Sequence, residues 1–181
     1  MPGADRANVP GVGARPMSPA IKRIGRGRFR LRLSPDEVAL LRGLPDQLRS
    51  VLAQSEADPV LDRLFPPAYL EPEDTDRDSE YRRLVHEDLL NEKLANLEVV
   101  TSTLERGSVT IRRWTVDLSE EEALAWLGVL NDLRLALGVR LGITEDFDGD
   151  VDESDPRAPG MHLLSYLGLL EEYLVEALAS G

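Results

Sequence analysis

The residues whose spacing first suggests chemistry are carboxylates. Glu87, Asp88 and Glu92 lie close together on a predicted helix, and paired carboxylates can act as general acid and base. Such catalysis needs a buried cleft that separates two pKa values, and nothing in the flanking sequence predicts one. Charged residues at these spacings usually form a solvated helix face or intrahelical ion pairs. We predict no catalytic residues, and an enzyme that uses these three carboxylates is kept as an alternative.

A second acidic cluster, residues 146–153, invites a calcium-binding interpretation. An EF-hand loop needs glycine at its sixth position and glutamate at its twelfth. Registers that start at Asp146 or Asp148 place neither residue there. His86 and His162 are the only histidines, and zinc sites usually gather several such ligands. We therefore predict no metal site and no cofactor, and expect exposed or structural histidines.

Charge is unevenly distributed along the chain. Its 181 residues carry a net charge of −12. Residues 71–80 and 145–155 hold thirteen acidic residues and one arginine, which accounts for the whole excess, whereas the first 33 residues hold eight bases and one acid. The sequence therefore predicts a basic N-terminal arm, a balanced helical body and two acidic segments.

The basic residues that matter most lie on a predicted strand. In residues 28–33 arginine alternates with an apolar residue, which is typical of a half-buried strand. Such a face can contact phosphate or an acidic protein. The alternatives are an ordinary solvated face that protects a sheet edge, or a face covered by the acidic segments. We predict a partner-binding surface made by Arg26, Arg28, Arg30, Arg32 and Arg112.

A strand-to-helix unit that occurs twice must position these arginines. Residues 28–37 and 113–122, at an offset of 85, each join an alternating strand to a serine that is followed three residues later by glutamate. Ser34 and Ser119 are therefore predicted to cap helices in capping boxes. We expect the two strands to pair antiparallel, and the shared pattern makes an approximate two-fold relation plausible.

Leucine periodicity predicts five or six helices. The first predicted helix begins at Ser34 and breaks near Gly43 and Pro45. Further helices are predicted over 45–54, 59–65, 79–104, 119–141 and 161–179. The segment 119–141 is apolar on nearly all sides, which predicts a central helix. Arg134 interrupts it, and we expect an internal partner such as Glu92 or Glu87, with a ligand contact as the alternative.

The predicted fold class is therefore mainly α (α+β), a five- to six-helix bundle with a two-stranded β-ribbon packed against it. Residues 1–20 are expected to form a disordered N-terminal tail, and 21–181 a single helical domain, for which the resemblance described next implies a regulatory role. Cysteine is absent, which excludes disulfides and thiol switches. No apolar run is long enough for a membrane span and no secretory signal is present, so a cytoplasmic protein is expected.

Several segments resemble one protein family. They are the basic strand leading into residues 33–38, then 58–69, 80–84 and 126–142, of which Leu64-Phe-Pro-Pro-Ala-Tyr69 and Leu130-Asn-Asp-Leu-Arg134 are the most specific. Over residues 20–180 the chain resembles an actinobacterial family, formerly a domain of unknown function, that is labelled oxidative-stress regulator AosR. The resemblance implies a cytoplasmic, non-catalytic regulator of transcription that responds to redox stress through a protein partner.

We therefore expect a non-enzymatic, transcription-linked regulator or adaptor that works through protein contacts and without a cysteine switch. The expected partner is a protein, with the transcription machinery or a sigma factor among the candidates. A direct DNA-binding regulator is the alternative, and it predicts affinity that falls steeply with salt. No membrane contact is expected. A homodimer through Leu90, Leu97 and Leu104 is a further candidate, although two heptads are too few to predict a coiled coil.

Overall fold

The computed structural model describes residues 19–54, 58–66, 75–110, 113–144 and 154–180, with side chains on the long helix described from residue 83 onward. These residues form six helices and four strands. In chain order they are β1 (Ala20–Gly25), β2 (Arg28–Leu33), α1 (Pro35–Arg42), α2 (Leu44–Leu52), α3 (Pro59–Leu64), α4 (Thr75–Arg106), β3 (Ser108–Thr110), β4 (Arg113–Ser119), α5 (Glu120–Arg140) and α6 (Ala158–Ala179).

The strands form one antiparallel sheet in the order β1-β2-β4-β3, so the predicted two-stranded ribbon was wrong. The basic arm before β2 is itself a strand, because the chain reverses at Gly27, whose φ of 63° is readily adopted by glycine. The predicted strand that leads to Ser119 is β4, and β3 before it forms a hairpin with it, in which Thr110 of β3 lies opposite Arg113 of β4. Residues 1–18 of the predicted tail lie outside the described residues, whereas Ala20 already belongs to β1.

The two repeated units are related by an approximate two-fold axis through the sheet. Leu31 lies opposite Val116, which is also its equivalent at the offset of 85, and Phe29 lies opposite Leu118. Both predicted capping boxes are confirmed: Ser34 Oγ accepts from the Glu37 amide at 3.2 Å, and Ser119 Oγ accepts from the Glu122 amide at 3.1 Å. Each central strand therefore runs directly into a capped helix, and the two helices leave from opposite ends of the strand pair.

One face of the sheet packs on the helices and closes the core. Its apolar side chains are almost fully buried: Phe29, Leu31, Leu33, Trp114, Val116 and Leu118. The indole of Trp114 lies so close to Gly107 that a Cβ there would come within 2.0 Å of Trp114 Cε2. Glycine is thus required where α4 ends and β3 begins, because any larger residue would displace the indole.

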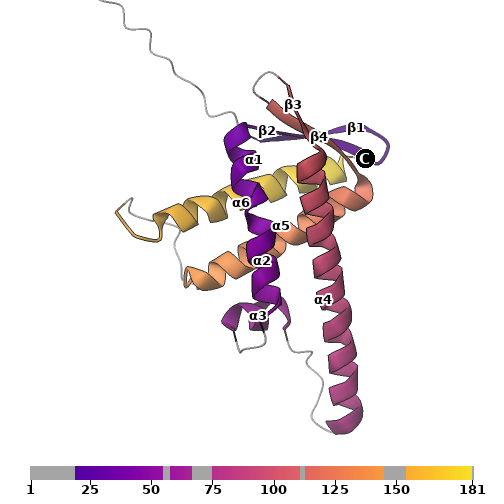
Figure 1. Cartoon of the computed structure of the whole chain (residues 1–181), viewed down its shortest axis with the longest axis vertical. Coiled ribbons are helices and arrows are strands. Elements are labelled where there is room, and N and C mark those ends of the chain that lie inside the picture. Colours follow the sequence, from indigo (N-terminus) through magenta and orange to yellow (C-terminus); the bar gives the residue numbers. More distant parts are fainter. Residues whose placement is uncertain (1–18, 55–57, 67–74, 111–112, 145–153, 181) are drawn as a thin grey trace, which may run out of the picture.

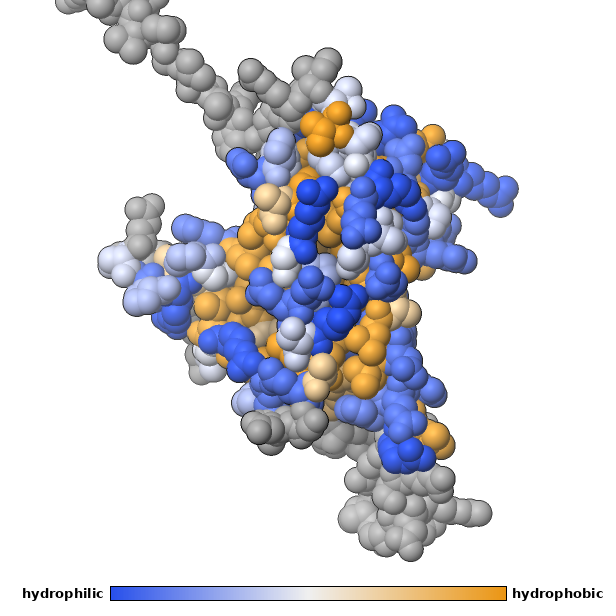
Figure 2. All heavy atoms as spheres, viewed as in Figure 1, coloured by the Kyte–Doolittle hydropathy of each residue, from blue (hydrophilic) through white to orange (hydrophobic). Residues whose placement is uncertain are grey.

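The helices cross beneath the sheet as Figure 1 shows. α5 and α6 lie side by side, α1 and α2 follow one another in front of them, and α4 runs alongside and extends beyond the rest of the body. α5 contacts α2, α3, α4, α6 and the two central strands, so the predicted central helix is confirmed. Figure 2 shows hydrophilic side chains covering most of the sheet end and hydrophobic ones between the helices. No helix of the described residues packs on the other face of the sheet, which carries the charged side chains of the strands.

Candidate partner-binding face of the sheet

The alternation of the strands directs a set of charged and hydroxyl side chains away from the core. Because successive side chains point to opposite faces, the residues between the buried ones of β2 and β4 lie on the outside, as do their partners in the ladders with β1 and β3. We call this surface the outer face. It comprises Lys22, Arg28, Arg30, Arg32, Ser108, Thr110, Arg113, Thr115 and Asp117.

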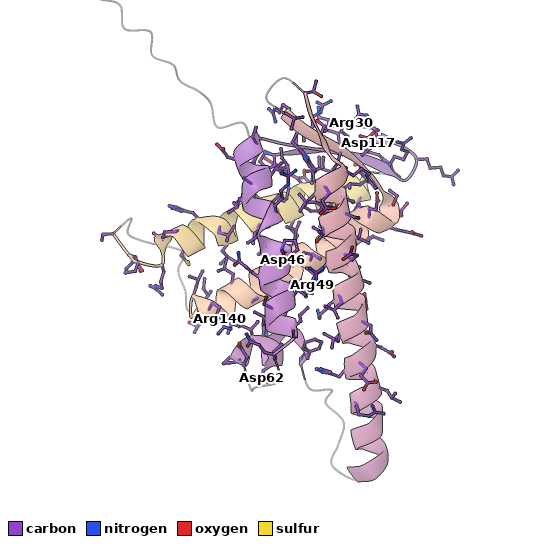
Figure 3. The ribbon with its side chains drawn as sticks, viewed as in Figure 1. Arg30, Asp46, Arg49, Asp62, Asp117 and Arg140 are labelled. Atoms are coloured by element: carbon purple, nitrogen blue, oxygen red, sulfur yellow. The ribbon has the colours of Figure 1, made fainter. Side chains whose placement is uncertain are left out.

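A carboxylate offsets part of the positive charge on one half of the outer face. Arg30 and Asp117 lie directly opposite each other in the strand ladder, and Figure 3 labels both at the sheet. Arg30 donates from Nε to Oδ1 at 2.7 Å and from Nη2 to Oδ2 at 2.9 Å. Arg28 Nη2 lies 3.8 Å from the same carboxylate. The hydrogen bond from Arg30 is the main reason that the pKa of Asp117 lies below its usual range. We call Arg28, Arg30 and Asp117 the paired half.

Arg106 at the end of α4 borders the paired half and is also occupied. Its Nη2 donates to the backbone carbonyl of Asp117 at 2.8 Å, and its Nη1 donates to Glu122 at 2.7 Å. Glu122 is also the capping residue of α5, and the bond from Arg106 holds its pKa below the usual range. The cations at this end of the face are therefore committed to contacts within the chain.

The other half of the outer face keeps its positive charge. Lys22, Arg32 and Arg113 surround a shallow hollow of about 500 Å³, and the hydroxyls of Ser108, Thr110 and Thr115 complete its lining with Ala20 and Arg30. Among the described residues none of these three cations forms an ion pair, and no carboxylate lines the hollow. We call Lys22, Arg32 and Arg113 the open half.

The five arginines predicted from sequence have different surroundings. Arg28, Arg30 and Arg32 project from one strand face, Arg26 is exposed in the β1–β2 turn, and Arg112 lies outside the described residues. Sequence reasoning missed the role of Asp117, because its position opposite Arg30 depends on the register between strands 87 residues apart. The role of the five arginines in binding a partner stays a prediction.

Other sequence candidates do not converge on a site. Glu87, Asp88 and Glu92 are exposed along α4, and Glu87 accepts an intrahelical bond from Arg83 at 2.7 Å. His162 is exposed, and the exposed ring of His86 lies 4.3 Å from that of Phe65. Within the described residues no group of histidines and acids could hold a metal ion. The acidic loop 146–153 lies outside them.

Two predictions about side chains on α4 and α5 need correction, and one buried group was missed. Arg134 pairs with Glu171 of α6, and not with Glu92 or Glu87, because its side chain crosses to α6 over Gly168. Sequence reasoning also missed Asp132, which is buried and accepts from Lys93 Nζ at 2.7 Å. The leucine stripe suggested for a homodimer is used internally, since Leu97 and Leu104 are buried in this chain's own core.

The fold and the outer face define a small α+β domain with a charged sheet surface. No helix that the structure describes combines the length and the apolar character needed to cross a membrane. The family model described as "domain of unknown function (DUF2017)" matches residues 17–178, and the chain belongs to this family. No solved structure gives a significant match.

Similar proteins occur in mycobacteria. The "Oxidative stress regulator AosR" of Mycobacterium tuberculosis (strain H37Rv) is 31% identical over 177 residues, which cover 82% of this chain and 81% of that protein. The protein of the same name from Mycobacterium bovis gives the same values. A Mycobacterium leprae relative is 30% identical over 185 residues, covering 83% of this chain and 82% of the relative. The resemblance identified from sequence motifs is thus confirmed.

Proposed function

We propose that this chain is a non-enzymatic, transcription-linked regulator in the oxidative-stress response, and that it binds an acidic protein partner through the open half of the outer face. The regulatory role is supported by the names of its mycobacterial relatives. The observation that carries the binding proposal is the cluster of Lys22, Arg32 and Arg113 around one hollow without a carboxylate among the described residues.

The negative net charge of the chain makes it notable that three neighbouring cations form no ion pair among the described residues. In a chain with net charge −12, acidic groups are plentiful, and Asp117 already pairs with the neighbouring Arg30 and Arg28. Cations that stay unpaired on a shared surface attract an acidic partner and steer its approach. Arginine can also grip a carboxylate with two parallel hydrogen bonds. The hydroxyls between the cations offer further donors to such a partner.

A protein partner fits this surface better than duplex DNA. Proteins that bind DNA tightly often make about six to ten phosphate contacts, whereas the open half supplies three cations. The net charge of −12 also repels the phosphate backbone at distances within the screening length. The absence of cysteine means that this chain carries no thiol switch, so in the proposed role oxidation is sensed elsewhere.

The test compares the two halves of the outer face. We expect the triple variant Lys22→Gln/Arg32→Gln/Arg113→Gln to lose the proteins that the wild-type chain captures, under cross-linking and mass spectrometry, from a cell extract of its host. The single variant Arg28→Gln, whose side chain lies at the paired half, is expected to keep them. Binding of the leading captured protein is then measured with purified components by calorimetry at two salt concentrations.

Two outcomes would contradict the proposal. Equal direct binding by the triple variant and the wild type would remove the open half from the interface. Tight binding of duplex DNA by the wild type, with a steep salt dependence that the triple variant loses, would replace the protein partner by nucleic acid. Far-ultraviolet circular dichroism checks that each variant is folded. Replacing Arg30 is avoided because its loss would leave Asp117 without its main partner.

A further inference from the structure

A second hollow, separate from the sheet, lies between α3, α5 and α6. It has a volume of about 490 Å³, within the range of about 300 to 1,000 Å³ that is usual for small-molecule sites. Arg63 comes from α3, Asn131 and Arg134 from α5, and Leu164 from α6. The hollow therefore joins three elements, and an occupant would contact all of them at once.

The polar part of this hollow is rich in hydrogen-bond donors, although Glu171 offsets the charge of Arg134. Two guanidinium groups, those of Arg63 and Arg134, line it together with the Asn131 amide and the Thr144 hydroxyl, and no described lining residue is acidic. Arg134 is held by Glu171 through Nη1, and it crosses α6 with Nη2 3.7 Å from the position of a Cβ on Gly168. One arm of Arg134 is thus fixed while the other has no partner among the described residues. Arg63 likewise forms no ion pair within them.

The remaining walls are apolar and partly exposed. Leu135, Val139 and Leu164 line the hollow, and each is only half-buried. The chain turn after α5 closes one end, because the Ile143 amide donates to the Gly138 carbonyl at 2.9 Å and Gly142 adopts a φ of 66°. A guanidinium pair beside an apolar wall suits a molecule with an acid group at one end and a hydrocarbon body at the other.

A glycine lines the hollow on its α5 side. Gly138 lines it from the last turn of α5, and a Cβ added there would meet no atom within 4 Å. Glycine disfavours the helical conformation relative to alanine, so this position loses helix stability without the close packing that explains Gly107. Space for an occupant is a reason for a glycine at Gly138.

We infer that this hollow binds a small organic anion, with a carboxylate or a phosphate between Arg63 and Arg134 and an apolar body against Leu135, Val139 and Leu164. A ligand that binds only the folded state also stabilises it. Through such a site a small anion acts directly on a chain that has no cysteine to oxidise. It uses none of the outer-face residues, so its failure would leave the proposed partner surface untouched.

The test titrates the whole chain with three matched probes. Phenylacetate and phenyl phosphate carry the two acid groups, and phenylacetamide is the neutral control. We expect saturable binding of at least one anion by calorimetry, about ten-fold or more tighter than binding of the amide, because charge-assisted hydrogen bonds are lost with the amide. The same anion is expected to raise the melting temperature. The preferred anion identifies the acid group that the site takes.

Variants locate the site. Gly138→Leu fills the hollow and is expected to abolish anion binding, whereas Gly25→Leu, at another glycine with open space around it, is expected to bind normally. Arg63→Gln is expected to weaken binding about ten-fold, in line with the loss of one charge-assisted contact. Absence of binding by both anions, equal binding of the amide, or binding that survives both Gly138→Leu and Arg63→Gln would overturn the inference.

Discussion

At the scale of single residues, Lys93 and Asp132 form the most buried ion pair among the described residues. Their side chains are 13% and 9% exposed, and the pair joins α4 to α5. Burial raises the pKa of Asp132, and the hydrogen bond from Lys93 works in the opposite direction. We expect Asp132→Ala to lower the free energy of unfolding at pH 7 by about 3 kcal/mol, because Lys93 is left without its partner. Urea denaturation measures the change.

A double variant separates the pair from the packing around it. Replacing both ions with apolar residues of similar size is often neutral or stabilising. Lys93→Met/Asp132→Leu is therefore expected to recover most of the stability lost by Asp132→Ala. If the double variant were as unstable as the single one, the loss would come from packing at the α4–α5 contact and not from an unpaired charge.

At the scale of elements, the two capping boxes hold equivalent helices in the repeated units. Ser34→Ala and Ser119→Ala are each expected to cost about 1 kcal/mol, or about 2 to 4 °C in melting temperature for a domain of this size. The serines lie at opposite ends of the central strand pair, roughly 20 Å apart at about 3.3 Å per residue, so their effects should add. Calorimetry of the two single variants and the double variant checks this.

Ser102→Ala provides the matched control for the caps. Ser102 is exposed on α4 and donates to the Val99 carbonyl at 3.0 Å, so its loss removes a serine hydrogen bond without uncapping a helix. We expect it to change the melting temperature by less than either cap variant. A double cap variant no less stable than one single variant would contradict independent capping.

Local patterns explain which elements could be predicted from sequence. The capping boxes, the break near Gly43 and the alternation in β2 each depend on residues within one turn or one strand, and all were confirmed. The hairpin partners β1 and β3 were missed because their pairing depends on contacts across the sheet. For the same reason sequence could group the arginines on one face but could not show that Asp117 pairs with two of them, Arg28 and Arg30.

At the scale of the whole molecule, charge placement links the fold to the proposed function. Antiparallel pairing about the Leu31–Val116 centre brings Asp117 opposite Arg30, whereas Thr115 lies opposite Arg32. The same register therefore places a carboxylate on one half of the outer face, and among the described residues it places none on the other half, which stays more positive. A shift by two residues would move Asp117 away from Arg30, so register and binding surface are determined together.

Acid stability is the property of the whole molecule that these ion pairs control. The pKa values of Asp117 and Glu122 are lowered mainly by hydrogen bonds from Arg30 and Arg106, and that of Asp58 mainly by the Val60 amide. A lowered native pKa contributes stability above the unfolded value, near 4 for these groups, and this is lost as the pH falls through the native pKa. Asp132 acts in the opposite sense, since its raised pKa favours the native state as pH falls.

We therefore expect the free energy of unfolding to decrease as the pH falls below about 4, because four lowered carboxyl pKa values, with that of Asp155 beside Arg157 as the fourth, outweigh one raised value. Asp117→Asn removes one of the four and should make the acid decrease shallower, whereas Asp36→Asn, an exposed acid in the first turn of α1, serves as the control. Urea denaturation between pH 3 and pH 7 measures both slopes. Identical slopes for wild type and Asp117→Asn would mean that Arg30 does not lower the pKa of Asp117 in the folded chain. The distinction between the paired half and the open half of the outer face would then lose its electrostatic basis.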